Sequence, residues 1–418
     1  MKLSRFGKRF SAHTGTVQLM EDLGDALTGN GDVLMLGGGN PAHIPEVQSF
    51  FRERLQRIVE SPREFAHMAG NYDPPRGDPR FLAALAGLFR ERFGWNVSPS
   101  NIVLTAGSQA GFFLILNMLA GECEDGTRRR ILLPLAPEYI GYSDLGLTDP
   151  MFSTRRPAIE TFPDRTFKYH VDFDALAPDD DTAAICVSRP TNPTGNVLTD
   201  IEMEKLERLA QSMEVPLIVD NAYGMPFPNI LFTPATLRWN ENIILCMSLS
   251  KIGLPGARTG IVIASEEITA AIATMNGKLS LAMGSFGPAI ALDLIQSGEI
   301  LSLSENVIRP YYRRKAERAM ALCHERLAGL DYHIHKAEGA IFLWLWFRDL
   351  PITNDELYER LKRRGVLVLS GSHFFPGLDE DWRHRYECIR VSIAMDDSVV
   401  ERGIGIIAEE VRHAYGAG

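Results

Sequence analysis

The sequence lacks a framework of paired cysteines. Its 418 residues include five cysteines, and no two of them are close together in the chain. An odd number of isolated cysteines without an export signal favours free thiols in a reducing compartment, so we expect a cytoplasmic protein. Each thiol is expected to be a small buried side chain rather than a nucleophile or a metal ligand. The five are Cys123, Cys186, Cys246, Cys323 and Cys388.

Histidines at the spacing of a metal site are also lacking. The ten histidines are dispersed, and the one close pair, His333 and His335, is two residues apart. That spacing places both side chains on one face of a strand. We expect the strand to be a solvated edge, and we expect no metal.

Long hydrophobic runs and an excess of positive charge are absent as well. The longest apolar run, Ala340 to Phe347, is far shorter than the about 20 residues of a membrane-spanning helix and is predicted to be a buried strand. Lys and Arg number 43 and Asp and Glu number 53, which gives a formal charge of −10. This balance disfavours nucleic acid and anionic membranes as partners.

What the sequence does contain is an alternation of short apolar strands and helices. A helix is predicted at 109–119, and another begins at Thr199 and Glu202, which have the spacing of a capping box. Near-continuous apolar strands separated by helices predict a largely parallel sheet covered on both faces. The predicted strands are 102–104, 131–133, 184–187, 217–219, 243–245 and 261–264.

The last quarter of the chain has a different pattern. A long charged helix is predicted from Pro310 to Leu327, and a second, amphipathic helix near 355–364. Three apolar segments, 341–347, 366–369 and 388–391, are predicted strands. This pattern indicates a smaller α+β domain.

Residues with functional side chains follow the apolar runs of the predicted sheet. Ligands of such sheets bind beyond the carboxyl ends of the strands, so we expect these residues to meet in one crevice. They are Gly107-Ser108-Gln109, Tyr139, Asn192, Asp220 and Ser248 to Lys251.

Lys251 suits chemistry with a carbonyl cofactor. A deprotonated lysine amine condenses with an aldehyde into a Schiff base. A free lysine has a pKa of about 10.4, and desolvation beside the charge of a cofactor would lower it to the range that a general base needs. Seven positions later, Arg258 could hold a phosphate. The alternatives are a solvated lysine and a surface ion pair.

Asp220 and Tyr223 suit the two ends of a pyridine ring. The carboxylate could keep a ring nitrogen protonated, and the phenol could donate to a ring oxygen. The alternatives are a helix N-cap for Asp220 and a core aromatic for Tyr223. Asn192 could reach both the ring oxygen and a substrate carboxylate, or it could be a plain turn residue.

The remaining candidates suit a phosphate, an aromatic ring and a carboxylate. Ser108 and Gln109 open a predicted helix, whose N-terminus favours phosphate. Tyr139 could stack on a flat ring or belong to the core. Arg390 stands between Ile389 and Val391 on an apparent strand. A buried arginine needs an anionic partner, and its planar fork fits a carboxylate.

Together these residues resemble the class I/II aminotransferases of the pyridoxal-phosphate fold-type I superfamily. The resemblance extends over nearly the whole chain, and its motifs stand in the family's order. They are Leu36 to Pro41, Tyr72 with Gly77, Gly107-Ser108-Gln109, Pro137-Glu138-Tyr139, Asn192 to Gly195, Asp220 with Tyr223, Ser248 to Lys251, Arg258 and Arg390. Four longer segments resemble the branch that acts on valine and pyruvate: 37–45, 135–142, 167–173 and 338–347.

The resemblance implies a role for each motif residue. Lys251 would bind pyridoxal 5'-phosphate as a Schiff base and then move a proton between substrate and cofactor. Asp220 would hold the ring nitrogen protonated, and Tyr223 and Asn192 would bind the ring oxygen. Substrate carboxylate would be bound by Arg390, Asn192 and the N–H of Gly39. The residues implied at the phosphate and the ring face are Ser108, Gln109, Ser248, Arg258 and Tyr139.

The resemblance also implies an assembly, domains and a reaction. Tyr72 resembles the tyrosine that this family lends to the phosphate of a partner subunit, so we expect a homodimer with shared sites. We expect residues 1–47 to form an arm that contributes to the small domain, 48–307 the large cofactor-binding domain, and 308–418 the small domain. The expected reaction converts valine and pyruvate into 2-oxoisovalerate and alanine.

Other interpretations remain at this point. A different aminotransferase, or a lyase or decarboxylase with the same cofactor, would share many of these residues. Ser248 to Lys251 also fits the Ser-x-x-Lys pattern of acylating enzymes, although their partner motifs are missing. A DNA-binding regulator with an aminotransferase-like domain is disfavoured because the family motifs begin by Leu36. The arm at Thr16 to Leu19 could line the side-chain pocket, and the sequence assigns no role to His13 or Glu138.

Overall fold

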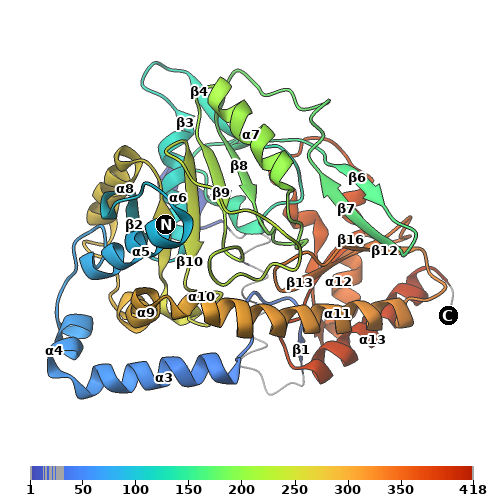
Figure 1. Ribbon diagram of the computed structural model, residues 1–418. Coiled ribbons are helices and arrows are strands. Elements are labelled where there is room, and N and C mark those ends of the chain that lie inside the picture. The colour runs from blue at the N-terminus through green and yellow to red at the C-terminus, as the bar shows by residue number, and fades with distance from the viewer. Residues whose placement is uncertain are drawn as a thin grey trace.

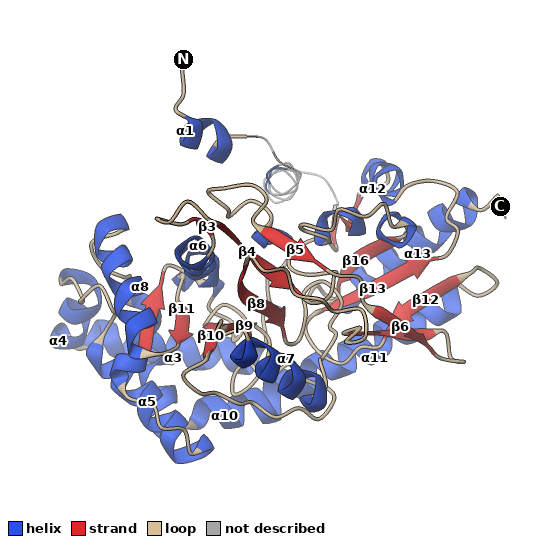
Figure 2. Ribbon diagram, turned by 90° about the horizontal axis from the view of Figure 1, so that it is seen from above, coloured by secondary structure: helices blue, strands red, loops and turns tan. Residues whose placement is uncertain are grey.

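The computed structural model describes residues 2–12, 14, 17, 21, 24 and 33–416. In this part of the chain two large sheets lie next to each other, a third sheet has two strands, and helices pack against both large sheets (Figure 1). The long helix α11 (Arg309–Arg326) runs across the lower half of this view, above α3, toward the second sheet. Helix α1 (Arg5–Phe10) lies at the outside of the molecule in Figure 2, where Arg9 pairs with Asp149 and the Phe10 ring packs edge-on against Phe113.

The first sheet has eight described strands, in the order β2-β11-β10-β9-β8-β4-β3, with β5 paired to β4. Strands β10, β9, β8, β4 and β5 pair in parallel, whereas β11 is antiparallel to both of its neighbours. The predicted, largely parallel α/β sheet is confirmed. The strands are β2 (Ile102–Thr105), β3 (Gly121–Glu122), β4 (Arg128–Leu133), β5 (Phe152–Thr154), β8 (Thr182–Ser188), β9 (Leu217–Asp220), β10 (Ile243–Ser248) and β11 (Gly260–Ile263).

Helices cover both faces of this sheet, because alternate apolar residues of each strand point to opposite sides. Leu104 packs in a core with α5 (Pro79–Phe93), α7 (Asp200–Ser212) and α9 (Phe286–Ser297). Its neighbour Val103 packs in a core with α6 (Ser108–Leu119) and α8 (Glu266–Leu279). The sheet is therefore the middle layer of three.

The predicted capping box is present at the start of α7. The Thr199 hydroxyl accepts from the Glu202 N–H at 3.2 Å, and the Glu202 carboxylate accepts from the Thr199 N–H at 2.7 Å. Two donors at the helix end are satisfied in this way. On the inner face of the helix, Leu206 and Ala210 are fully buried.

The second sheet has six described strands in the order β15-β16-β13-β12-β7-β6. Two of them, β6 and β7, come from residues 158–170, inside the range predicted for the large domain. Strand β1 (Leu34–Met35) pairs in parallel with β14 (Val366–Leu367), so the N-terminal segment joins the C-terminal quarter. The predicted domain boundaries stay a prediction. The strands are β6 (Ala158–Thr161), β7 (Thr166–His170), β12 (Tyr332–His335), β13 (Phe342–Phe347), β15 (Leu369–Ser370) and β16 (Cys388–Ser392).

One expectation about this second region is wrong, and one predicted strand is divided. Strand β12 lies between β13 and β7 instead of at an edge, and His335 is buried with its Nδ1 2.8 Å from the Lys336 carbonyl. Burial lowers the pKa of His335 to about 3, so its ring is neutral. The apolar segment 366–369 is divided between two sheets, because Leu367 pairs with β1 and Leu369 with β16.

The other described helices complete both layers. They are α3 (Pro45–Glu60), α4 (Pro62–Phe65), α10 (Glu299–Leu303), α12 (Asn354–Arg363) and α13 (Asp397–Ala414), with short turns at η1 (Ala66–Gly70), η2 (Pro99–Asn101), η3 (Ile140–Tyr142), η4 (Pro255–Ala257), η5 (Ser304–Ile308), η6 (Gly371–Phe374) and η7 (Arg383–Tyr386). None of the helices in the described ranges is long and apolar enough to cross a membrane. All five cysteines are free, and Cys123 is the one that is not buried.

Candidate active site

The strand ends that carry the candidate residues meet at one edge of the first sheet. The register pairs Ser188 at the end of β8 with Asp220 at the end of β9. Ser248 at the end of β10 pairs with Gly260, which pairs in turn with Thr105 at the end of β2. The predicted convergence on this edge is therefore confirmed by the pairing of the strands.

Lys251 lies in the loop that joins the antiparallel strands β10 and β11. Its Nζ donates to the Gly39 carbonyl at 2.6 Å and lies 5.3 Å from the centre of the Tyr223 ring. Burial lowers the pKa of the amine to about 8; the positive charges of Arg390 and Arg258 act in the same direction, and Asp220 opposes them. At pH 7 about a tenth of this amine is therefore unprotonated, far more than for a free lysine, and the unprotonated form is the one that acts as nucleophile and base.

Asp220 is the last residue of β9, and the chain continues into a turn, so the helix N-cap alternative is not realised. The carboxylate accepts from the Tyr142 hydroxyl at 2.9 Å and from the Ala222 N–H at 3.1 Å. Burial raises its pKa to about 6. Among the described residues no cation forms an ion pair with Asp220, so this buried carboxylate suits a cationic ligand. The Tyr142 contact was missed from the sequence, where nothing relates the two positions.

Arg390 comes from β16 of the second sheet and reaches the first. Its guanidinium donates to Asn192 Oδ1 at 2.7 Å and to the Gly37 carbonyl at 2.6 Å. It lies 4.0 Å from the ring centre of Phe342 and 5.4 Å from that of Phe374. Burial lowers the pKa of Arg390 to about 10, and its buried Nε has no hydrogen-bond partner among the described residues. A buried guanidinium that contacts only neutral oxygens is suited to accept a carboxylate.

Two glycines, one at the N-cap of α6 and one at the start of β11, leave space around the N-terminal end of α6. Gly107 has a φ of +86°, and a Cβ at this position would lie 2.2 Å from Arg258 Nη2. At Gly260 a Cβ would lie 2.7 Å from the Ser108 nitrogen. No side chain caps the first turn of α6, so its N–H groups are available to an anion.

Gln109, Tyr139 and Ser248 lie at the same edge. The Gln109 amide donates to the Gly141 carbonyl at 2.9 Å, and its buried Oε1 has no partner among the described residues. The partly buried Tyr139 ring packs edge-on against Tyr142 at 5.3 Å. The Ser248 hydroxyl accepts from the Ser250 N–H at 3.2 Å. Ser248 ends a strand and does not open a helix, which is unlike the serine of the Ser-x-x-Lys enzymes.

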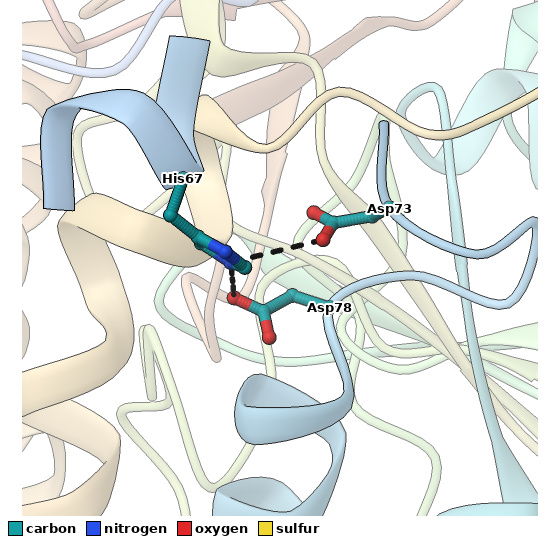
Figure 3. Close-up of side chains that lie close together, drawn as sticks. All are labelled: His67, Asp73 and Asp78. Carbon is teal, nitrogen blue, oxygen red and sulfur yellow. Dashed lines mark hydrogen bonds and ion pairs between the residues drawn. The ribbon is translucent and has the colours of Figure 1, made fainter. Parts of the chain in front are cut away.

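Tyr72 lies in the segment between η1 and α5, and its side chain is 83% exposed in the single chain. Next to it, His67 Nε2 lies 3.1 Å from Asp78 and 3.7 Å from Asp73 (Figure 3). These three groups have the composition of a metal site. Both carboxylates nevertheless have other protein partners, since Asp73 accepts from the Ser285 hydroxyl at 2.6 Å and Asp78 caps α5. The cluster ties the Tyr72 segment to the chain around it.

Comparison with known proteins agrees with this arrangement. The family model "Aminotransferase class I and II" matches residues 51–407. The chain belongs to the class I and II aminotransferases. It is 51% identical to the valine–pyruvate aminotransferase of Escherichia coli over 99% of both chains. The structure of the valine–pyruvate aminotransferase from Salmonella typhimurium is 50% identical, covers 97% of this chain and all of its own, and superposes with a TM-score of 0.89.

More distant structures share the fold alone. The Thermus thermophilus aspartate aminotransferase is 21% identical, covers 98% of this chain and 100% of its own, and has a TM-score of 0.77. Aminotransferases of this family depend on pyridoxal phosphate, and the described residues fit that cofactor. The unpartnered Gln109 Oε1, the uncapped end of α6, the buried Asp220 and the amine of Lys251 lie at one edge of the sheet.

Two positions singled out in the sequence cannot be placed. His13 and most of the segment 16–19 lie outside the described residues, so the expected side-chain pocket at Thr16 to Leu19 stays a prediction. The sequence assigned no role to Glu138, which immediately precedes Tyr139. Its side chain is fully buried and accepts a hydrogen bond from the Ser188 N–H. The backbone oxygens of Gly37 and Gly39 accept hydrogen bonds from Arg390 and Lys251, respectively. Nothing in the sequence indicated that these two oxygens would be acceptors.

Proposed function

We propose that this aminotransferase moves an amino group from valine to pyruvate, and that it produces 2-oxoisovalerate and alanine. The observation that carries this proposal is the identity of 51%, over 99% of both chains, to a valine–pyruvate aminotransferase. The buried, incompletely partnered guanidinium of Arg390 supports it, because both substrates carry an α-carboxylate. Two cations lower the pKa of Lys251, Arg390 and Arg258. One would serve the substrate carboxylate and the other the phosphate.

We propose the following roles for these side chains. Pyridoxal phosphate, when bound, supplies an aldehyde and an electron-withdrawing ring. The lowered pKa of Lys251 lets its amine act as the nucleophile and then accept and return the substrate Cα proton. Asp220 would hold the ring nitrogen protonated. The donors to the ring oxygen would be Tyr223 and Asn192.

The phosphate and the carboxylate would be held by separate groups. Ser108, Gln109, Ser248 and Arg258 lie around the end of α6 and would hold the phosphate. Tyr139 would stack on the ring. Arg390 and Asn192, already 2.7 Å apart, would hold the substrate carboxylate together with the N–H of Gly39.

A homodimer with shared sites is part of the proposal. Tyr72 is exposed, and its segment contacts the end of α8, since Asn276 donates to the Pro75 carbonyl at 3.1 Å. At and just beyond the end of α8, three apolar side chains are exposed: Leu279 at 64%, Leu281 at 63% and Phe286 at 50%. A second copy of the chain would cover these side chains and receive Tyr72. The five free thiols favour the reducing cytoplasm as its location.

A complementation experiment tests the shared site. The variants Lys251→Ala and Tyr72→Ala are each purified, mixed, dissociated and allowed to re-associate. A mixed dimer has one site with both defects and one site with neither, so activity should return toward about a quarter of the wild-type level at equal mixing. Absence of recovery in a mixture that forms mixed dimers would exclude the contribution of Tyr72 to a partner's site.

A substrate panel tests the reaction. The purified protein is incubated with valine, alanine, aspartate or phenylalanine as amino donor and with pyruvate or 2-oxoglutarate as acceptor. We expect valine with pyruvate to be among the best pairs; if it is not, the valine–pyruvate assignment fails and another aminotransferase reaction takes its place. A product formed from an amino acid without any keto acid would instead indicate a lyase or a decarboxylase.

A further inference from the structure

The carboxyl group of Glu138 is buried beside the candidate site without a cation. Its side chain is fully buried, and no ion pair forms with it among the described residues. Oε1 accepts from the Ser188 N–H at 2.8 Å, and Oε2 lies 2.5 Å from Ser188 Oγ and 3.3 Å from the Tyr139 N–H. Two hydrogen bonds to one residue at the end of β8 fix the orientation of this carboxyl group.

From Ser188 the contacts continue to Asp220. Ser188 Oγ lies 3.4 Å from the Tyr142 hydroxyl, and that hydroxyl donates to Asp220 Oδ2 at 2.9 Å. The register of β8 and β9 places Ser188 directly opposite Asp220. All four side chains are buried. A continuous path of polar atoms therefore joins Glu138 to Asp220 away from water.

The protonation state of Glu138 decides how this path is oriented. A hydroxyl group has a single proton to donate. If Glu138 is ionised, the Ser188 hydroxyl must donate to it, so Tyr142 accepts no hydrogen bond from Ser188. The ionised carboxylate is then a second buried negative charge near Asp220. If Glu138 is protonated, it can donate to Ser188, Ser188 to Tyr142, and Tyr142 to Asp220. In that arrangement every donor points toward Asp220, and each bond polarises the next.

We propose that Glu138 is protonated in the folded protein and, through Ser188 and Tyr142, orients Asp220 and keeps it ionised. Glu138 is thus a positioning residue, and the inference rests on the proposed role of Asp220. Burial raises the pKa of Glu138 to about 8, which agrees with a neutral side chain at pH 7. The titratable groups that interact with the path are Lys251 and four others, whose pKa values burial raises: Tyr139, Cys186, Tyr223 and Cys246.

Infrared spectroscopy of the full-length, coenzyme-loaded protein tests the protonation state directly. At neutral pH we expect the C=O stretch of a protonated carboxylic acid in the wild type and in Asp220→Asn, and its loss in Glu138→Gln. The band should disappear as the pH rises through about 8. Absence of the band from the wild type, or its loss in Asp220→Asn but not in Glu138→Gln, would overturn the proposal.

The rates of three variants test the path. A glutamine at position 138 can donate its amide to Ser188 Oγ and accept from the Ser188 N–H, so Glu138→Gln should keep kcat within about threefold. Tyr142→Phe and Ser188→Ala each remove one hydroxyl, and kcat should fall about tenfold with little change in KM, because a hydrogen bond to a charged group is lost or weakened. Thermal unfolding of each variant identifies any that fail to fold.

The outcomes separate two kinds of failure. A fall in Glu138→Gln as large as that in Tyr142→Phe would mean that the ionised carboxylate is the working form, and the proposal would be wrong. Full activity in Asp220→Asn would instead refute the role of Asp220, whatever the infrared spectra show for Glu138.

Discussion

Replacement of Arg390 by lysine tests how the substrate carboxylate is bound. The guanidinium already donates to Asn192 Oδ1 and to the Gly37 carbonyl, and its Nε has no partner among the described residues. A lysine keeps the charge but has fewer donors, and it lacks the planar fork that binds both carboxylate oxygens. If the lysine keeps the two protein contacts, the substrate loses one charge-assisted hydrogen bond.

The expected loss follows from the strength of such a bond. A hydrogen bond to a charged group contributes about 1.5–3 kcal/mol, and about 1.4 kcal/mol corresponds to a factor of ten. For Arg390→Lys we therefore expect kcat/KM for valine to fall by about 10- to 150-fold.

The assay measures kcat/KM for valine and, as a control, for an amine of similar shape without a carboxylate. The slow reaction of that amine should be nearly equal in the two proteins, and the affinity for the coenzyme should not change. A loss below about twofold for valine, or an equal loss for the amine, would refute carboxylate binding by Arg390.

Four further changes have expected outcomes. Lys251→Ala should fold normally by circular dichroism, yet show no transamination and no coenzyme fixed by borohydride. Tyr72→Phe should raise the dissociation constant of the coenzyme about tenfold in an absorbance titration, because a donor to a charged phosphate is lost. Lys168→Met should lower the free energy of unfolding by about 3–5 kcal/mol in denaturant titrations, since it leaves Glu338 without its buried partner. In coenzyme-free protein, folded Glu138 keeps its proton up to about pH 8, whereas the unfolded chain releases it above the ordinary pKa of 4.5. The free energy of unfolding of the wild type should therefore fall relative to that of Glu138→Gln between about pH 4.5 and about pH 8. Equal pH dependence of the two proteins would contradict this.

The site could be predicted from the sequence wherever a strand and its end lie in one short segment. Apolar runs followed by polar residues predicted that Asp220, Ser248 and Ser108 lie at the ends of β9, β10 and β2, and the strand register confirms this. Parallel neighbours then bring such ends together whatever their separation in the chain. The roles of these residues came from resemblance to a family and stay proposals.

Contacts that depend on packing between distant segments could not be predicted. Tyr142 reaches Asp220 across 78 positions, and no spacing rule relates them. The sequence predicted a solvated edge for His335 because His333 and His335, two residues apart, share one face of a strand. Its burial depends on β7, which begins at Thr166 and pairs alongside β12. Whether a strand is central or at an edge is a property of the whole sheet, and the local sequence contains little information about it.

The proposed role of Arg390 would link recognition of a carboxylate to the folding of the chain. Its partners, Gly37 and Asn192, are 353 and 198 positions away, and they belong to segments that pack with different sheets. The group forms only when both sheets are folded. In the substrate-free chain its charge is buried and compensated by neutral oxygens, and this incomplete compensation lowers its pKa to about 10. If Arg390 binds the substrate carboxylate as proposed, that carboxylate offsets the cost of burying the guanidinium. Part of the affinity for substrate would then arise from an unfavourable burial already present in the folded protein.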